Sequence, residues 1–235
     1  MSAALPFPTT PVLGRDAGAG PLRMGFCVSG GGHLFRAAVR HANVLGIAPR
    51  TLVLESKAPP DVEAFARDHG VAVRRLVATR RPALDEELVA AFDDADAELW
   101  ALTFDRILPP AVVSPRRGRI VNVHMALLPA FAGMHGIRQT LAGGARFGGA
   151  TLHEVDELMD NGPLIAQCAV ALRPGDDEDG AGARIWPLLR ATYLQTLAWY
   201  AQGRVERDES GRLWVRGAEY GSLPVNPRIE LPDLD

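Results

Sequence analysis

Cysteine is scarce in this chain of 235 residues, and the only two, Cys27 and Cys168, lie far apart within apolar runs. Their positions predict two buried, reduced thiols and no disulfide framework. No apolar run approaches the roughly 20 residues that a membrane-spanning helix requires. The first residues also lack the basic start and continuous apolar segment of a signal peptide, so we expect a cytoplasmic protein that does not associate with membranes.

An excess of basic residues is missing too, because the formal net charge is -3. A chain with this balance has no general surface for nucleic acid, and we expect none as a partner. The six histidines form no zinc-helix pair and no cysteine cluster accompanies them, so we expect no metal. The glycine turn at residues 30–32 lacks the later glycine of a dinucleotide fingerprint, which makes a nicotinamide-dependent reductase the weakest alternative.

Short apolar runs alternate with helical periods from residue 24 to residue 124. This alternation predicts an α/β fold with a mostly parallel, twisted sheet and helices on both faces. Residues 1–22 have no period and suggest a loose arm, 23–203 a single catalytic domain, and 204–235 a hairpin and tail. The expected strands are 24–29, 51–55, 71–77, 99–103, 120–124, 147–155 and 163–172. The expected helices are 34–45, 60–69, 84–92, 136–142 and an amphipathic one at 184–203.

Polar residues follow the carboxyl ends of several expected strands, where open parallel sheets bind ligands. Asn122 and His124 are two apart on one strand and therefore point to the same side, as a pair that holds a carbonyl oxygen would. A satisfied histidine at a strand edge is the other interpretation of the same pattern. The turn of Gly30, Gly31, Gly32 and His33 opens a helix, so its free amides favour an anion, although a tight turn without ligand also fits.

Three carboxylates, Asp156, Glu157 and Asp160, lie in the loop between the last two expected strands of the domain. Most acids in such loops are solvated turn residues. Their spacing alone does not distinguish a catalytic carboxylate from the others.

Four motifs between residues 119 and 170 resemble those of the glycinamide ribonucleotide formyltransferase family and, more broadly, of the formyltransferase superfamily. They are Asn122-Val123-His124, Leu127-Leu128-Pro129, Gly133-Met134-His135 with Arg138-Gln139, and Asp160-Asn161-Gly162-Pro163. Weaker similarity covers about residues 24–203 and includes the segment 104–108. The resemblance implies a Rossmann-like fold and transfer of the formyl group of 10-formyltetrahydrofolate, a co-substrate, to an amine.

The resemblance also implies roles for particular residues. Asn122 and His124 would bind the formyl oxygen, while Asp160 would keep His124 charged or relay a proton from the amine. His153 would support the site, and His135 is either a supporting residue or a plain surface histidine. The implied folate-binding residues are Arg106, Ile107, Leu108, Val113, Asp156, Glu157, Leu158 and Met159. The implied acceptor-binding residues are Gly30, Gly31, Gly32, His33 and Arg81.

The sequence departs from the family in its acceptor half. Leu34 stands where the family has an asparagine, Leu189 falls at or near a family glutamate, and Met125-Ala126 replaces a Pro-Ser pair. From these changes we expect a small-molecule amine other than glycinamide ribonucleotide: an amino sugar, an amino acid derivative or a natural-product intermediate. We also expect glycinamide ribonucleotide to be a poor substrate.

Other functions remain as alternatives: formylation of glycinamide ribonucleotide in purine synthesis, a formyltetrahydrofolate deformylase, a folate-binding protein without catalysis, and a methionyl-tRNA formyltransferase. The short flanking segments argue against the deformylase and the tRNA enzyme, whose families carry an extra domain. The intact Asn122, His124 and Asp160 argue against a mere binding protein. The sequence leaves open whether the chain forms a homodimer.

Overall fold

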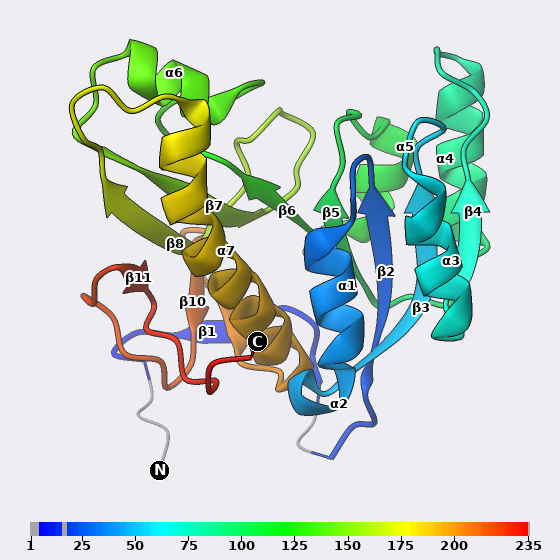
Figure 1. The fold of residues 1–235 in the computed structure, drawn as a ribbon. Coiled ribbons are helices and arrows are strands. Elements are labelled where there is room, and N and C mark those ends of the chain that lie inside the picture. Colours follow the sequence, from blue (N-terminus) through cyan, green and yellow to red (C-terminus); the bar gives the residue numbers. More distant parts are fainter. Residues whose placement is uncertain (1–4, 16–17, 235) are drawn as a thin grey trace. The chain divides into compact units, whose positions relative to one another are not determined.

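The computed structural model describes residues 5–15 and 18–234, which fall into two compact units (Figure 1). Residues 18–122 form one, here called the parallel-sheet unit; residues 1–17 and 123–235 form the other, the antiparallel unit. Strand β6, Ile120–His124, runs from the first into the second after Asn122. The mixed, mostly parallel sheet confirms the predicted fold class.

The parallel-sheet unit has the strand order β6-β5-β2-β3-β4, and all of its neighbours are parallel. Its strands are β2 (Leu22–Val28), β3 (Ile47–Leu54), β4 (Ala72–Arg75), β5 (Leu99–Thr103) and the start of β6. Its helices are α1 (His33–Arg40), α2 (Ala42–Leu45), α3 (Pro60–Asp68), α4 (Ala83–Asp93) and α5 (Pro110–Val113), followed by a 3-10 turn, Ser114–Arg116. The helix expected at 34–45 is divided at His41, whose backbone leaves the helical region.

The order of these strands reverses at β2. The chain moves outward from β2 through β3 to β4, then returns to the other side of β2 as β5 and β6. Because parallel crossovers are right-handed, α1 and α3 cover one face and α4 the opposite face. Figure 1 shows α1 and α3 side by side on their common face. The carboxyl ends of β2 and β5 therefore flank a topological switch point, where ligands of such sheets bind.

The antiparallel unit contains β7 (Phe147–Glu154), β8 (Leu164–Ala171) and β11 (Val225–Asn226), paired antiparallel, together with helices α6 (Gly136–Ala142) and α7 (Glu178–Ala201). A separate small sheet has the order β1-β9-β10. Strands β9 (Val205–Asp208) and β10 (Leu213–Val215) lie where the sequence suggests a hairpin.

The N-terminal segment differs from the expected loose arm. Thr9–Pro11 form strand β1, which pairs antiparallel with β9, and Val12 N donates to Val205 O at 2.9 Å. Pairing with a distant strand supplies the order that the local sequence does not encode. Residues 1–4 and 16–17 of the expected arm lie outside the described residues.

Helix α7 begins earlier than expected and is not amphipathic along its second half. Asp177 caps its start by accepting the Gly180 N–H at 2.8 Å. Residues 192–200 are all buried, since β7 and β8 pack against this helix and the C-terminal tail also contacts it. In that contact the buried Gln195 accepts the N–H groups of Glu230 and Leu231, both at 2.7 Å. A helix covered on several sides needs no polar face.

Among the described residues, no helix is both long and apolar enough to cross a lipid bilayer.

Candidate active site

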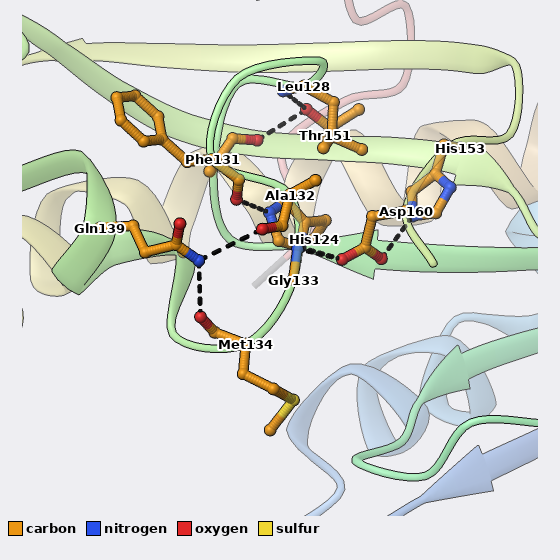
Figure 2. Close-up of polar contacts among 12 residues, drawn as sticks. His124, Leu128, Phe131, Ala132, Gly133, Met134, Gln139, Thr151, His153 and Asp160 are labelled. Atoms are coloured by element: carbon orange, nitrogen blue, oxygen red, sulfur yellow. Dashed lines mark hydrogen bonds and ion pairs between the residues drawn. The ribbon is translucent and has the colours of Figure 1, made fainter. Parts of the chain in front are cut away.

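His124 ends β6 and is buried, with 6 % of its surface exposed. Its Nε2 lies 2.8 Å from the carbonyl oxygen of Phe131, and its Nδ1 lies 3.2 Å from Oδ2 of Asp160 (Figure 2). A carbonyl oxygen can only accept, so Nε2 carries a proton. Nδ1 faces the Asp160 carboxylate, so both ring nitrogens of His124 have an oxygen as partner.

Asp160 is the centre of this cluster. Its Oδ2 also accepts the Gly133 N–H at 2.9 Å, while its Oδ1 faces His153 Nε2 at 3.6 Å (Figure 2). Its side chain is 12 % exposed, and its backbone adopts a positive φ of 50°. Position 162 requires glycine, because a Cβ there would lie 1.9 Å from the carbonyl oxygen of Glu154. The Asp-Asn-Gly-Pro motif thus delivers one carboxylate to two histidines.

His153 lies on β7 and is almost fully buried. Its Nδ1 donates to the carbonyl oxygen of Glu154 at 2.8 Å. Burial lowers the pKa of His153, against the raising effect of the Glu154 carbonyl and of Asp160. The ring is therefore neutral near pH 7, and its Nε2 presents a lone pair toward Asp160.

Thr151 holds the loop that supplies Phe131 O and Gly133 N. The Thr151 hydroxyl donates to Ala126 O at 2.7 Å and accepts the Leu128 N–H at 3.1 Å. Gln167 adds Nε2 contacts to Leu128 O at 2.9 Å and to Thr151 Oγ1 at 3.0 Å. Thr151 is fully buried, so these bonds are protected from water. The Leu-Leu-Pro motif is therefore an ordered support of the cluster.

A second residue, Gln139 of α6, holds the far end of the same loop. Its Nε2 donates to Met134 O at 2.8 Å and to Ala132 O at 3.3 Å (Figure 2). The side chains of Phe131 and His135 are carried on backbone with positive φ, 57° and 63°. Non-glycine residues in this region concentrate at functional sites, where surrounding contacts hold them.

Asn122 precedes His124 by two residues on the same strand and is half-buried. Alternation along the strand turns both side chains to one side. The joint role of Asn122 and His124 stays a prediction of the sequence.

The loop of residues 156–159 contains four of the expected folate-binding residues, and they differ in their contacts and exposure. Asp156 Oδ1 accepts the Leu158 N–H at 2.9 Å, which is a local turn contact. Leu158 and Met159 expose 65 % and 51 % of their surface, although they are apolar. Exposed apolar side chains beside a polar cluster are available to cover a ligand.

The expected acceptor turn leads directly into helix α1. Gly32 has a φ of 65° and precedes helix α1, and a Cβ on it would lie 2.9 Å from Val62 Cγ1. Gly30 and His33 are exposed, whereas Gly32 is buried. The first amides of α1 have no carbonyl partner within the helix, and this turn is where they begin.

The other expected ligand segments of the parallel-sheet unit follow β5. Ile107 is 59 % exposed, but Leu108 and Val113 are 7 % and 2 % exposed, so these two side chains belong to the core. Arg81 Nη2 donates to Ile107 O at 2.8 Å and its Nε lies 3.2 Å from Asp85. Two sequence candidates, Arg81 and Ile107, are therefore in direct contact.

The sequence analysis did not single out Glu55, which the structure places with Arg106. Glu55 directly follows β3, is only 2 % exposed, and accepts Arg106 Nε at 2.8 Å. A charged residue that ends an apolar strand was the available signal. Only the fold could show that β3 brings it beside Arg106, which follows β5.

Residues 5–15 and 18–234 contain no group of three or more His, Cys, Asp or Glu side chains that could hold a metal.

The fold is that of an α/β enzyme, and the paired His124 and Asp160 give it a polar cluster of a catalytic kind. The family model described as formyl transferase matches residues 22–197, and the chain belongs to this family; it is a folate-dependent formyltransferase. The chain is 37 % identical to phosphoribosylglycinamide formyltransferase of Escherichia coli K12 over 156 residues, 65 % of this chain and 73 % of that protein. It is 37 % identical to the protein of that name from Mycobacterium tuberculosis H37Rv over 171 residues, 70 % and 78 % of the two chains.

Solved structures of the same family have a similar fold. The chain is similar to glycinamide ribonucleotide transformylase 1 of Symbiobacterium toebii, with a TM-score of 0.75 and 27 % identity, covering 83 % of this chain and 94 % of that one.

These comparisons contradict the expectation of an acceptor other than glycinamide ribonucleotide, since relatives at 37 % identity over most of their length carry the phosphoribosylglycinamide name. The structure shows why the sequence argument failed. Leu34 and Leu189, the two replacements that supported it, are 3 % and 0 % exposed. Both side chains belong to the cores of their units. An apolar residue there removes no exposed group that a ligand could contact.

Proposed function

We propose that this chain transfers the formyl group of 10-formyltetrahydrofolate to the amino group of glycinamide ribonucleotide, giving tetrahydrofolate and the formylated amide. The observation that carries the chemistry is the contact of one carboxylate, Asp160, with both His124 and the neutral His153. The acceptor is inferred from the named relatives.

The first step is attack of the amine nitrogen on the formyl carbon, which forms a C–N bond and places negative charge on the formyl oxygen. The amide of Asn122 would donate to that oxygen. The Nε2–H of His124 would also donate to it, in exchange for its present bond to Phe131 O. Fixed donors of this kind typically contribute a factor of about 10² to 10³ in turnover.

The second step is loss of the folate nitrogen, N10, which must gain a proton as the C–N10 bond breaks. The attacking amine must lose one proton, so the reaction is balanced by transfer from one nitrogen to the other. Asp160 is the group in the cluster that can accept this proton, and His153 Nε2 at 3.6 Å offers a second acceptor. Positioned acid–base groups typically contribute a factor of about 10² to 10⁴.

Substrate binding would use the segments that remain exposed. In the antiparallel unit, Leu158 and Met159 would cover the apolar pterin ring. In the parallel-sheet unit, the turn at residues 30–33 would hold the phosphate of the ribonucleotide through backbone amides, and the backbone of residues 106–108 would contact the folate.

The test is a steady-state assay with 10-formyltetrahydrofolate and glycinamide ribonucleotide, followed by the absorbance change on formation of tetrahydrofolate. We expect a kcat/KM of about 10⁴ M⁻¹s⁻¹ or higher, the lower limit of ordinary enzymes. A value a hundredfold below this would contradict the proposed acceptor. Formate release in the absence of any amine must be measured in parallel, because a deformylase would produce formate at the same rate without the acceptor.

A further inference from the structure

A buried carboxylate lies at the switch point of the parallel sheet, outside the cluster described above. Glu55 follows β3, Ser29 follows β2, and Asp105 and Arg106 follow β5. These residues therefore share the carboxyl edge of three adjacent parallel strands in the order β5-β2-β3. The two loops that start there are the turn 29–33 and the segment 104–108.

Contacts among these residues join the two loops across the switch point. Ser29 Oγ accepts the Asp105 N–H at 2.8 Å. Glu55 Oε1 accepts both Nε and Nη2 of Arg106, an arrangement that fixes the plane of the guanidinium. Lys57 Nζ lies 3.7 Å from Glu55 Oε2 and 3.5 Å from Asp105 Oδ2. Arg106 thus ties the segment 104–108 to Glu55, while Ser29 ties the turn to the backbone of that segment and is itself a side-chain partner of Glu55.

The state of Glu55 fits a permanent structural charge. Burial by itself would raise the pKa of Glu55, but the Ser29 hydroxyl, the Arg106 guanidinium and Lys57 together bring this pKa below its ordinary value. The carboxylate is therefore ionised at neutral pH. Its Oε2 is buried and accepts no hydrogen bond within the described part of the chain.

Direct contact of Glu55 with a ligand is disfavoured by the same geometry. In dinucleotide-binding sheets, an acid in the second strand binds ribose hydroxyls, and Glu55 occupies a comparable place. Here, however, the carboxylate is 2 % exposed, while Arg106 and Lys57 are 33 % and 60 % exposed. The cations lie outward and the acid lies beneath them, so the acid acts through its neighbours.

We propose that Glu55 is a positioning residue that fixes the acceptor turn 29–33 and the folate segment 104–108 relative to each other, and that binding of both substrates depends on it. This inference rests on the proposed function. The Glu55 charge orients Arg106 directly and, through Ser29, the backbone that carries Asp105. The exposed side of Arg106 then presents a fixed cation to an anionic substrate group.

The test is the variant Glu55→Gln, which keeps the shape of the side chain and removes its charge. We expect the KM values for glycinamide ribonucleotide and for 10-formyltetrahydrofolate each to rise about tenfold, as loss of a charged hydrogen-bond partner does. We expect kcat to stay within about threefold, because Glu55 touches no reacting atom. The dissociation constant of tetrahydrofolate should rise by the same factor as the KM for 10-formyltetrahydrofolate.

The matched control is Glu98→Gln. Glu98 is also paired with an arginine of the same unit, with Oε2 3.5 Å from Arg23 Nη1, but it precedes β5 at the opposite end of the strands. The KM values of the Glu98→Gln variant should equal those of the unmodified chain. If the Glu55→Gln variant has the same KM values as the unmodified chain, the inference is overturned. Failure of the unmodified chain to form product would instead reject the proposed function.

A double-mutant cycle separates positioning from general loss of structure. If Glu55 acts through Arg106, the variant Arg106→Gln should raise KM similarly, and the double variant should be no worse than the more affected single one. Additive effects would contradict the inference. Should Glu55→Gln not fold, Ser29→Ala replaces it, because it breaks the link to Asp105 N while leaving the Glu55–Arg106 pair; an unchanged folate KM in that variant would also overturn the inference.

Discussion

Asp160 reaches His124 from a left-handed backbone conformation, with a φ of 50° and a distance of 3.2 Å from Oδ2 to Nδ1. A non-glycine residue in this region costs of order 1 kcal/mol or more and persists only where other contacts fix it. Here the Gly133 N–H and His124 hold the carboxylate. The conformation is explained by the contacts that the carboxylate makes, which gives the pair a functional interpretation.

Removal of the Asp160 charge should reduce turnover with little effect on folate binding. In Asp160→Asn, the amide oxygen can still accept Gly133 N–H, but the ring of His124 loses its carboxylate partner. We expect kcat to fall about a hundredfold or more, while the dissociation constant for tetrahydrofolate changes less than about threefold. Stopped-flow assays and equilibrium titration measure both. Asp177→Asn serves as the control, since asparagine caps a helix as well as aspartate; near-normal turnover of Asp160→Asn would refute its role.

The Thr151 hydroxyl should support stability and activity together. In Thr151→Val, the buried Leu128 N–H loses its acceptor and Ala126 O loses its donor, which should lower the free energy of unfolding by about 2 to 3 kcal/mol. Turnover should fall as well, because the loop carries Phe131 O and Gly133 N. Urea unfolding and kinetics measure these effects.

The control for Thr151 is Thr140→Val in α6. The Thr140 hydroxyl donates only to Gly136 O at 2.7 Å, inside the same helix. Its loss should cost less than about 1 kcal/mol. Equal losses in the two variants would show that the loop is not held through Thr151.

His153 should make the chain less stable in acid. Because burial lowers its pKa in the folded state, the unfolded chain binds a proton below its ordinary pKa of about 6.5 while the folded chain does not. The free energy of unfolding should thus fall as the pH drops through this value, by up to about 1.4 kcal/mol per pH unit. His153→Asn, whose amide can still donate to Glu154 O, should show a smaller slope between pH 7.5 and 5.5. Parallel curves for the two proteins would contradict the assignment.

Deletion of residues 1–12 should destabilise the fold. It removes β1 and its pairing with β9, and it removes Phe7, whose ring centroid lies 5.0 Å from that of Trp214. A loss of about 2 kcal/mol corresponds to a decrease in Tm of about 4 to 8 °C for a chain of this size. A deletion of residues 1–4 leaves these contacts in place and should keep the original Tm. Equal Tm values for both truncations would restore the interpretation as a loose arm.

The fold class could be predicted from the sequence because its signal is local. Apolar runs such as residues 24–28 and 99–103 and the helical periods between them depend only on neighbouring residues. The Asn-x-His pair was also accessible, since alternation along one strand fixes which side chains share a side.

Contacts between distant segments were decided only by the tertiary structure. The sequence could not separate Asp160 from Asp156 or Glu157, because the choice depends on a carboxylate meeting His124 and His153 from other strands. It could not show that Leu34 and Leu189 lie in the core, nor that Glu55 pairs with Arg106. Local pattern determines whether a residue is helical, extended or apolar; burial and partners arise only when strands far apart in the chain are brought to one edge.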